Sequence, residues 1–530
     1  MLTPVATYEA LTTQVDWRFP ARLNMAAQTC DDWATAEPER VAIVEITPAA
    51  RREVTYGALR HRADTLARLL LARGAGAGDR IGVLRSQDAW CAAAHIAIWK
   101  IGAISVPLFK LFQRDALAVR IGDAAAGLVI TDREGMAIMG DLATPLVADD
   151  VAVTDEPFET VKFETAKFET VETGPETPAV LIYTSGTTGA PKGALHGHRM
   201  LAGHLPGVEM SHEFLGQPGD CLWTPADWAW IGGLFDVAMP ALALGVPVVA
   251  ARMEKFDAQT CQSIIAQGAV KNVFFPPTAL RMLKASGTTI SGLRTVASGG
   301  ESLGAEILDW GRAALGVSIN EFYGQTECNM VAASCGALFE AEAGCIGKPA
   351  PGFDIAVLDA EGAPTTDEGD VAVKRGAGSM MLGYWNRPDE TAAKYKGDWM
   401  LTGDRGIWQG DYLRFVGRED DVISSAGYRI GPSEIEDCLL RHPSVATAGV
   451  VGKPDALRGE IVKAYVVVKK GVKADAALAK ALQSHVKTHL ANYSYPREIS
   501  FLDALPMTVT GKVIRKELKA RAMTETETDI

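Results

Sequence analysis

Short apolar runs alternate with amphipathic segments along the first third of the chain. Between Tyr56 and Arg73 apolar residues recur on one face of a helix, and Gly74 follows as a helix terminator. Residues 79–84, 104–107 and 180–182 are short apolar runs bounded by turn residues, as in buried strands. Strands that alternate with helices in this way predict a mostly parallel α/β sheet.

The pattern changes in the last third of the chain. From Gly344 to Val416 short apolar runs are separated by Gly, Pro and Asp turns, which is typical of a small β-barrel-like unit. A helix opening at Glu434 and a strand at 464–468 then indicate a separate α+β unit. A chain of 530 residues is too long for one hydrophobic core. We therefore predict an α/β fold: a large N-terminal domain (1–419) with two α/β subdomains plus a small β-barrel, followed by a smaller α+β C-terminal domain (420–530).

A loop rich in hydroxyls and glycines follows the apolar run at 180–182. Thr184 to Gly189 contains only Thr, Ser and Gly, and Pro191 and Lys192 come next. Glycines let the backbone approach an anion and point N–H groups at it, and hydroxyls add further donors. The spacing excludes a Walker A motif, and an exposed Ser/Gly linker fits poorly because a core strand precedes the run. The loop therefore predicts a phosphate-binding site.

Three further clusters fall in the middle of the chain. Residues 224–233 hold two tryptophans among small residues, and packing in the core is the rival interpretation for both. Residues 297–302 form a strand-to-helix turn, where open α/β sheets bind ligands. Residues 320–327 follow a predicted short strand and offer an aromatic face for a base and a carboxylate for Mg²⁺.

Charge and cysteine usage exclude several classes of protein. A net charge of -13 argues against a general nucleic-acid or anionic-membrane binder. Eight cysteines form no CxxC pair, and the spacing of Cys328, Cys335 and Cys345 matches no common zinc site, so we expect a reduced, cytoplasmic protein. The longest apolar run, 237–251, is too short for a membrane span, and we expect none. The repeated KFET unit in 158–173 predicts an exposed connector or β-like ribbon without chemistry.

In combination these motifs resemble one superfamily. YTSGTTGAPKG, SGGES, YGQTE, TGD, GREDD, GYRIGPSEIE and a terminal TGK occur in the order found in adenylate-forming enzymes, which include acyl-CoA synthetases, luciferases and adenylation domains. The chain looks most like the medium-chain acyl-CoA synthetases. The resemblance implies an AMP-forming ligase that uses ATP, Mg²⁺ and coenzyme A to activate a carboxylic acid through an acyl-adenylate.

The resemblance also assigns roles to individual residues. It implies Lys512, Thr184 and Glu327 as catalytic residues, with Glu327 binding the metal, Tyr323 stacking on adenine and Asp404 accepting the ribose hydroxyls. The residues that it implies for nucleotide binding are Thr184, Ser185, Gly186, Thr187, Thr188, Gly189, Lys192, Gly300, Glu301, Ser302, Glu321, Phe322, Tyr323, Gly324, Thr326, Asp404, Arg418, Arg429 and Lys512.

The second half-reaction and the acid are assigned in the same way. The C-terminal domain is expected to rotate about a hinge at Asp420 after adenylation, and the CoA tunnel is expected at Ser425, Ala426 and Gly427. The expected acyl pocket consists of Trp230, Ile231, Gly232, Gly299 and Gly324. Its three glycines replace bulkier residues of acetate-specific relatives, which favours a medium-chain, branched or aryl acid.

Competing functions and partners remain open at this stage. An adenylation domain that loads a carrier protein and a luciferase-like oxidase share the fold, whereas a silent nucleotide-binding regulator would be expected to lack Lys512 or Glu327. The expected partners are ATP, CoA and a small carboxylic acid, with no nucleic acid. The sequence leaves a homodimer open, and the resemblance suggests a lysine acetyltransferase that acts on Lys512.

Overall fold

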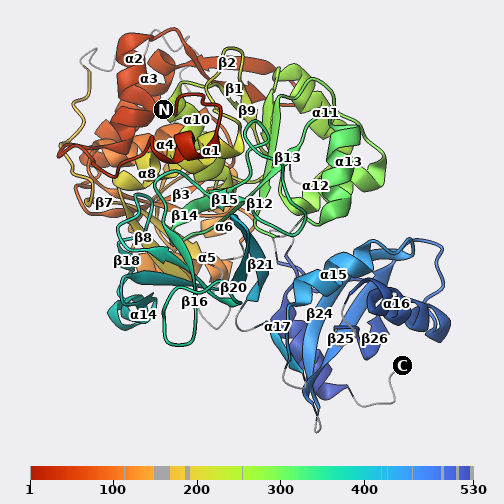
Figure 1. Ribbon diagram of the computed structural model, residues 1–530. Helices are drawn as coiled ribbons and strands as arrows, with labels where there is room; N and C mark the ends of the chain where they lie inside the picture. Colours follow the sequence, from red (N-terminus) through yellow and green to blue (C-terminus); the bar gives the residue numbers. More distant parts are fainter. Residues whose placement is uncertain are drawn as a thin grey trace.

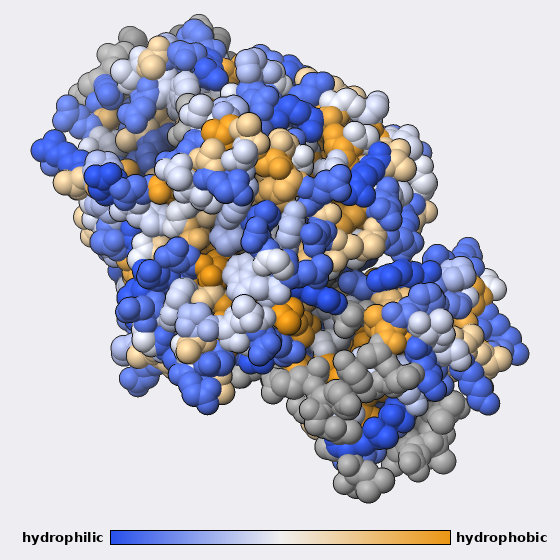
Figure 2. Space-filling view, in the orientation of Figure 1, coloured by the Kyte–Doolittle hydropathy of each residue, from blue (hydrophilic) through white to orange (hydrophobic). Residues whose placement is uncertain are grey.

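The computed structural model consists of a large N-terminal unit built around two sheets and a smaller C-terminal unit beside it (Figure 1). It describes residues 2–112, 114–148, 167–184, 191–253, 255–301, 303–418, 421–425, 428–455, 458–490, 494–508 and 512–525. On the face drawn in Figure 2, hydrophilic residues predominate and hydrophobic ones form small separate patches. Across the described residues, no helix is both long and apolar enough to cross a membrane.

The first sheet carries the predicted parallel strands. Its seven strands lie in the order β18 (Gly383–Tyr384), β8 (Lys192–Gly197), β7 (Pro178–Thr184), β4 (Ile104–Pro107), β3 (Arg80–Leu84), β5 (Leu128–Thr131) and β6 (Thr144–Val147). Strands β7, β4, β3, β5 and β6 run parallel to one another. Strand β8 pairs antiparallel with β7, and β18 pairs antiparallel with β8. The predicted strands at 79–84, 104–107 and 180–182 are thereby confirmed.

The second sheet has nine strands and is parallel in its centre. They lie in the order β15 (Lys348–Pro349), β14 (Asn329–Ala333), β13 (Ile319–Gln325), β12 (Thr295–Gly299), β11 (Asn272–Phe274), β9 (Leu222–Trp223), β10 (Val248–Ala250), β1 (Val41–Ile46) and β2 (Arg51–Thr55). Here one prediction was wrong: residues 320–325 do not follow a strand but lie within β13, because they pair with β12 on one side and with β14 on the other.

Helices cover the two sheets and join them. The predicted helix 56–73 is α3 (Tyr56–Ala72), capped by the Thr55 side chain. Every residue of α4 (Ala89–Lys100) is buried, and one apolar cluster includes α4 together with residues of both sheets. The remaining helices of this unit are α1 (Tyr8–Thr12), η1 (Ala27–Asp31), α2 (Asp32–Ala36), α5 (Arg114–Ala124), α6 (Arg133–Met139), α8 (Arg199–Ser211), α9 (Ile231–Gly233), η2 (Leu234–Ala238), α10 (Met239–Leu244), α11 (Ala258–Gln267), α12 (Pro277–Ser286), α13 (Ala305–Ala314) and α14 (Pro388–Ala393).

The expected small β unit is a five-stranded antiparallel sheet. Its strands are β16 (Ile355–Leu358), β17 (Gly369–Lys374), β20 (Trp399–Gln409), β19 (Tyr395–Lys396) and β21 (Tyr412–Arg418), with β21 paired to β20. The pairing of β20 with β21 sets Asp404 opposite Arg418. This sheet therefore positions the Asp404 carboxylate and the Arg418 guanidinium next to each other.

The C-terminal unit has its own sheet and its own apolar core. Its strands are β23 (Tyr428–Ile430), β22 (Ile423–Ser425), β25 (Gly459–Val468), β24 (Val445–Asp455) and β26 (Glu498–Phe501), and its helices are α15 (Pro432–Leu440), α16 (Ala476–His489) and α17 (Arg515–Thr524). Figure 1 shows α16 on the side of this unit away from the N-terminal unit. The expected hinge, Asp420, lies outside the described residues, so the boundary at 419/420 stays a prediction.

The described end of the KFET segment is anchored to the N-terminal unit. The Val171 amide donates to the Lys100 carbonyl at 2.9 Å, and the Thr170 hydroxyl donates to Asp31 at 2.6 Å. Residues 167–173 form no strand, which fits the predicted connector better than the β-like ribbon. Residues 158–166 lie outside the described part of the chain.

Candidate active site

Asp404 is the carboxylate around which the described part of the site is built. It is buried on β20, and its Oδ2 accepts hydrogen bonds from the Tyr323 hydroxyl at 2.6 Å and from the Gln325 Nε2 at 3.0 Å. The Nε of Arg418 lies 3.7 Å from the other oxygen, Oδ1. Burial raises the pKa of Asp404, whereas the hydrogen bond from Tyr323 and the charge of Arg418 oppose that rise. The carboxylate is thus fixed in position by two neighbouring strands.

Lys512 of the C-terminal unit reaches the turn after β12. A methyl group added at Gly300 would lie 3.6 Å from the Lys512 Nζ, and Gly300 itself has φ of +100°, which glycine tolerates best. The lysine side chain is open to solvent. Even so, partial desolvation by the surrounding protein lowers its pKa, with Glu301 acting against this effect and Arg418 with it. Lys512, Glu301 and Arg418 therefore share one electrostatic environment although they are far apart in the sequence.

A second carboxylate, Glu321, is buried beside this meeting point. Burial, and after it the charge of Asp437 of α15, raise its pKa to about 8. Asp437 also lies against the turn before α13, since a methyl group at Gly304 would be 3.3 Å from its carboxyl carbon. The C-terminal unit thus brings a negative charge toward Glu321 while it brings Lys512 toward Gly300.

Glu327 is held by a residue that the motifs do not mark. Its Oε1 accepts a hydrogen bond from the Tyr384 hydroxyl at 2.6 Å, across from β18 of the other sheet. The neighbouring Thr326 carbonyl lies 2.8 Å from the His196 Nε2 on β8. Burial lowers the pKa of His196 to about 3, so this ring is neutral and donates from one nitrogen. The carboxylate therefore sits where the two large sheets meet.

The phosphate loop is described only at its two ends. Thr184 ends β7 and pairs in register with Lys192 at the start of β8. The Lys192 Nζ lies 2.5 Å from Glu390 and 5.5 Å from the centre of the Tyr384 ring. Tyr384 thus contacts both Glu327 and the loop lysine. Ser185, Gly186, Thr187, Thr188, Gly189 and Ser302 lie outside the described residues.

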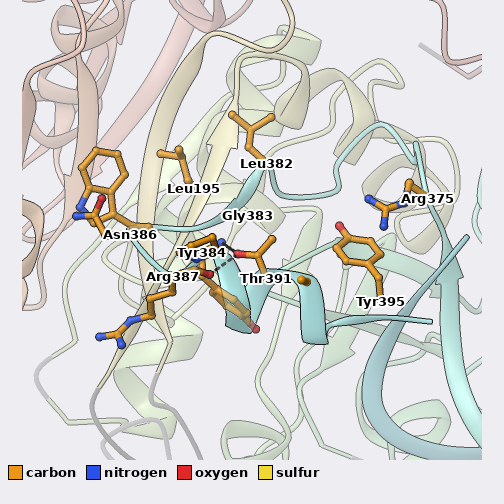
Figure 3. A pocket seen from close by; sticks show the side chains of 12 residues that line it. Leu195, Arg375, Leu382, Gly383, Tyr384, Asn386, Arg387, Thr391 and Tyr395 are labelled. Carbon is orange, nitrogen blue, oxygen red and sulfur yellow. Dashed lines mark hydrogen bonds between the residues drawn. The ribbon is translucent and has the colours of Figure 1, made fainter. Parts of the chain in front are cut away.

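An open hollow of about 620 Å³ lies beside Tyr384 (Figure 3). Leu195, Leu382, Arg375 and Tyr395 line it, and the Tyr384 amide donates to the Thr391 hydroxyl at its edge. No residue of the expected acyl pocket lines this hollow. It is therefore a different feature from the cavity that the three glycines were expected to open.

The three glycines of the expected acyl pocket do not face open space. A side chain at Gly324 would overlap the backbone carbonyl of Asn329, because β13 and β14 pair closely across a bulge there. A methyl group at Gly299 would lie 2.5 Å from the Phe322 ring, and one at Gly232 would lie 3.1 Å from the Phe274 ring. Aromatic rings and backbone therefore occupy the space that the glycines leave.

Aromatic residues form two groups, one on β11 and β13 and one around Trp230. The centres of the Phe274 and Phe322 rings lie 5.2 Å apart. Gly232, next to Phe274, is in the same turn as Trp230, whose ring lies 5.4 Å from Phe109 and 5.6 Å from Phe112. Trp228 is fully buried core, while Trp230 and Ile231 are half-buried. Phe109, Phe112 and Phe274 carried no local sequence signal.

The residues expected at the CoA tunnel are only partly described. Ser425 is buried at the end of β22 and pairs with Gly459, and Arg429 lies in β23. Ala426 and Gly427 lie outside the described residues. Their roles and that of Arg429 stay predictions.

Two family descriptions match this chain. Residues 30–385 match the AMP-binding enzyme family, and residues 434–512 match the AMP-binding enzyme C-terminal domain. Human acyl-coenzyme A synthetase ACSM4, mitochondrial, is 31% identical over 97% of this chain and 93% of its own length. Acetyl-coenzyme A synthetase of Bacillus subtilis (strain 168) is 30% identical over 94% and 90%. Human acyl-coenzyme A synthetase ACSM2B, mitochondrial, is 38% identical over 66% of this chain, a match that spans 62% of that protein.

Solved structures share the whole architecture. The acyl-CoA synthetase of Brucella canis is 30% identical and aligns with a TM-score of 0.71 over 98% of this chain and 99% of its own. The ATP-bound MatB of Rhodopseudomonas palustris is 27% identical and aligns with a TM-score of 0.81 over 94% and 99%. The similarity thus includes both the N-terminal and the C-terminal units.

Proposed function

Because the chain belongs to the family of AMP-binding enzymes, we propose that it is an ATP-dependent, AMP-forming acid–CoA ligase. In the first step a carboxylate oxygen of the acid attacks the α-phosphorus of ATP, and the bond to the β-phosphate oxygen breaks. Acyl-adenylate and pyrophosphate result. In the second step the CoA sulfur attacks the acyl carbon and loses its proton, and AMP leaves with the electrons of the broken C–O bond.

The approach of Lys512 to Gly300 is the observation that carries this proposal. Adenylation brings an anionic carboxylate to an anionic triphosphate, so a cation is needed where negative charge accumulates. Lys512 supplies that cation beside Glu301, Asp404 and Arg418. Because the side chain is open to solvent, it is also accessible to a substrate that enters between the two units.

Asp404 is proposed to orient the nucleotide. Tyr323 and Gln325 both donate to Oδ2, which leaves lone pairs on Oδ1 to accept from ribose hydroxyls. Tyr323 then has its ring beside the same sugar, where it would stack on the base. Glu321, which burial holds protonated at neutral pH, would offer a donor or acceptor to the adenine edge.

Glu327 fits a magnesium site by its chemistry. A single carboxylate beside phosphate oxygens suits this ion, and Tyr384 holds the Glu327 carboxylate at 2.6 Å while Lys192 flanks the same tyrosine. Bound magnesium would offset charge on the triphosphate oxygens. The residues of this chain orient that carboxylate and keep the loop lysine nearby through Tyr384 and Glu390.

A medium-chain, branched or aryl acid remains the proposed substrate, on different grounds from the glycines. A row that joins the Phe322–Phe274 pair to Trp230, Phe109 and Phe112 through the turn at Gly232 would offer apolar and aromatic contact beginning at β13. An acyl chain that lies along this row would bury apolar area, which acetate cannot do. The name of the Bacillus subtilis relative keeps acetate as the competing substrate.

A panel of carboxylic acids tests the proposal directly. Purified enzyme is mixed with ATP, Mg²⁺, CoA and one acid at a time, and pyrophosphate and thioester are both measured. We expect hexanoate, octanoate or benzoate to give the largest kcat/KM. Larger values for acetate would overturn the substrate assignment only, whereas absence of pyrophosphate with every acid would overturn the ligase. Thioester formation on a carrier protein but not on CoA would identify an adenylation domain.

Regulation and location complete the proposal. Acetylation of the solvent-exposed Lys512 would remove its charge and stop the first step. Rotation of the C-terminal unit about Asp420, which would withdraw Lys512, and a homodimer stay predictions. The eight cysteines are buried and outside disulfides, which supports a reducing compartment such as the cytoplasm.

A further inference from the structure

Two helices of the C-terminal unit bring a cysteine and histidines together, away from the nucleotide residues. Cys438 of α15 and His485 and His489 of α16 each offer a ligand atom, and the three atoms lie within 4.8 Å of one another. Cys438 is fully buried, His485 is half-buried and His489 is exposed. The cluster therefore has a dry inner side and an open outer side through which an ion can enter.

The spacing along each helix explains why these side chains meet. His485 and His489 are four residues apart on α16, so they lie on one face, while His442 lies just beyond the C-terminal end of α15. The His-x3-His spacing matches that of protein zinc ligands. The ring centres lie 4.3 Å apart for His485 and His489 and 5.3 Å apart for His442 and His485. His442 is accordingly the nearest candidate for a fourth ligand.

The donor chemistry suits a transition metal. Neutral imidazoles have the lone pair that a metal needs. A thiol with imidazoles is a borderline-soft donor set that favours zinc over magnesium or calcium.

The geometry needs only a small adjustment. Zinc bonds of about 2.0 to 2.3 Å place ligand atoms roughly 3.5 Å apart in a tetrahedral site. The exposed ring of His489 stands at the C-terminal end of α16, where rotation can make up the difference. The His485 Nε2 lies 3.1 Å from the Cys438 carbonyl, a contact that already holds the two helices in register.

We propose that Cys438, His485 and His489 form a zinc-class metal site, with His442 or water as the fourth ligand, that fastens α15 to α16. The site is independent of the magnesium proposed at Glu327 and of the ligase reaction. Asp437, next to Cys438 in the chain, faces Gly304 of the N-terminal unit. The metal would therefore stiffen the helix by which the C-terminal unit meets the N-terminal unit.

Cobalt spectroscopy on the untagged, full-length protein tests this site. After chelator treatment the protein is titrated with Co²⁺, which reports tetrahedral geometry in the visible range and thiolate bonding in the near ultraviolet. We expect one equivalent of Co²⁺ with both signatures, displaced by one equivalent of Zn²⁺. Absence of binding, or binding without the thiolate signature, would overturn the proposal.

Matched variants separate the site from other cysteines and histidines. Cys438→Ser should abolish the thiolate signature, and His489→Ala should weaken Zn²⁺ binding by at least about 10- to 100-fold. Cys261→Ser and His61→Ala, which alter a buried cysteine and a histidine of the N-terminal unit, should change neither. Because His489 is exposed, its variant is expected to fold even if Cys438→Ser does not. Equal affinities for the parent and His489→Ala would contradict the assignment.

Discussion

The two halves of the active site are built in different ways. On the N-terminal side, Asp404 receives two hydrogen bonds from β13, and Glu327 receives one from β18. On the C-terminal side, Lys512 is tied by its backbone to Thr508 of its own loop, at 3.0 Å and 2.7 Å, and its charge lies near those of Glu301 and Arg418. The N-terminal side is thus held in place by hydrogen bonds between side chains, whereas the C-terminal side belongs to a separate unit of the chain. A ligase that must first bring a carboxylate to ATP and then expose the resulting acyl-adenylate to CoA would benefit from this division.

Removing the positive charge of Lys512 should have the largest effect on activity. Lys512→Ala should reduce acyl-adenylate formation by at least about 100- to 1,000-fold, because the first step loses its positioned cation. Thioester formation from supplied acyl-adenylate should change by less than about threefold. Lys516→Ala, an exposed lysine on the following helix, is the control and should leave both steps unaltered. Equal losses in both half-reactions would show that Lys512 acts in both steps and not only in adenylation.

Removing the charge of Asp404 should weaken nucleotide binding in both half-reactions. Asp404→Asn keeps the size of the side chain but removes its charge, so the KM for ATP should rise by about 10- to 100-fold. The same variant should bind AMP and acyl-adenylate more weakly, as isothermal titration would measure. An unchanged affinity for AMP would show that the ribose is bound elsewhere.

Loss of the Tyr384 hydroxyl should affect the metal requirement more than the nucleotide. Tyr384→Phe should raise the Mg²⁺ concentration for half-maximal pyrophosphate release by about 10-fold, because Glu327 loses the donor that orients it. Tyr412→Phe is the matched control, since Tyr412 donates to the Glu340 carbonyl at 2.9 Å on the surface. A proportional loss of rate at all Mg²⁺ concentrations would argue against a positioning role.

A side chain at Gly324 should destabilise the strand rather than reshape a pocket. Gly324→Ala should lower the free energy of unfolding by about 1 to 3 kcal/mol, since even a methyl group overlaps the Asn329 carbonyl. Gly122→Ala has open space around it on α5 and should be neutral or stabilising. A stable Gly324→Trp that prefers acetate would restore the pocket interpretation.

The last prediction concerns how Glu321 makes the free energy of unfolding depend on pH. Its folded pKa of about 8 exceeds the ordinary value of 4.5, so the folded state binds more protons between these two values. Stability from this group is fully present below pH 4.5 and is lost as pH rises through 8. Relative to Glu321→Gln, the parent should therefore lose up to about 4 kcal/mol of unfolding free energy between pH 5 and pH 9 in urea unfolding. A constant difference would show that Glu321 is ionised in the folded protein.

Part of the site could be predicted because its signals are local. The strand 180–182 and the helix 56–73 follow from periodicity and turn residues within a few positions, whereas residues 297–299, expected in a turn, belong to β12. Tyr384 could not be predicted, because its partner Glu327 is 57 residues away and belongs to the other sheet. The surroundings of the three glycines in the expected acyl pocket could not be predicted for the same reason. The absence of a side chain is visible in the sequence, but the Phe322 ring and the Asn329 carbonyl that fill the space are not.

The sequence alone determined the order of strands and helices, the family motifs and the identities of Asp404, Glu327 and Lys512. The tertiary structure alone decided which of these residues meet, which glycines face empty space and which cysteine lies beside histidines. The physical reason is the range of each signal. Backbone periodicity and turn chemistry act over a few residues, whereas the contacts of Lys512 with Gly300 and of α15 with α16 depend on how separate sheets and helices pack.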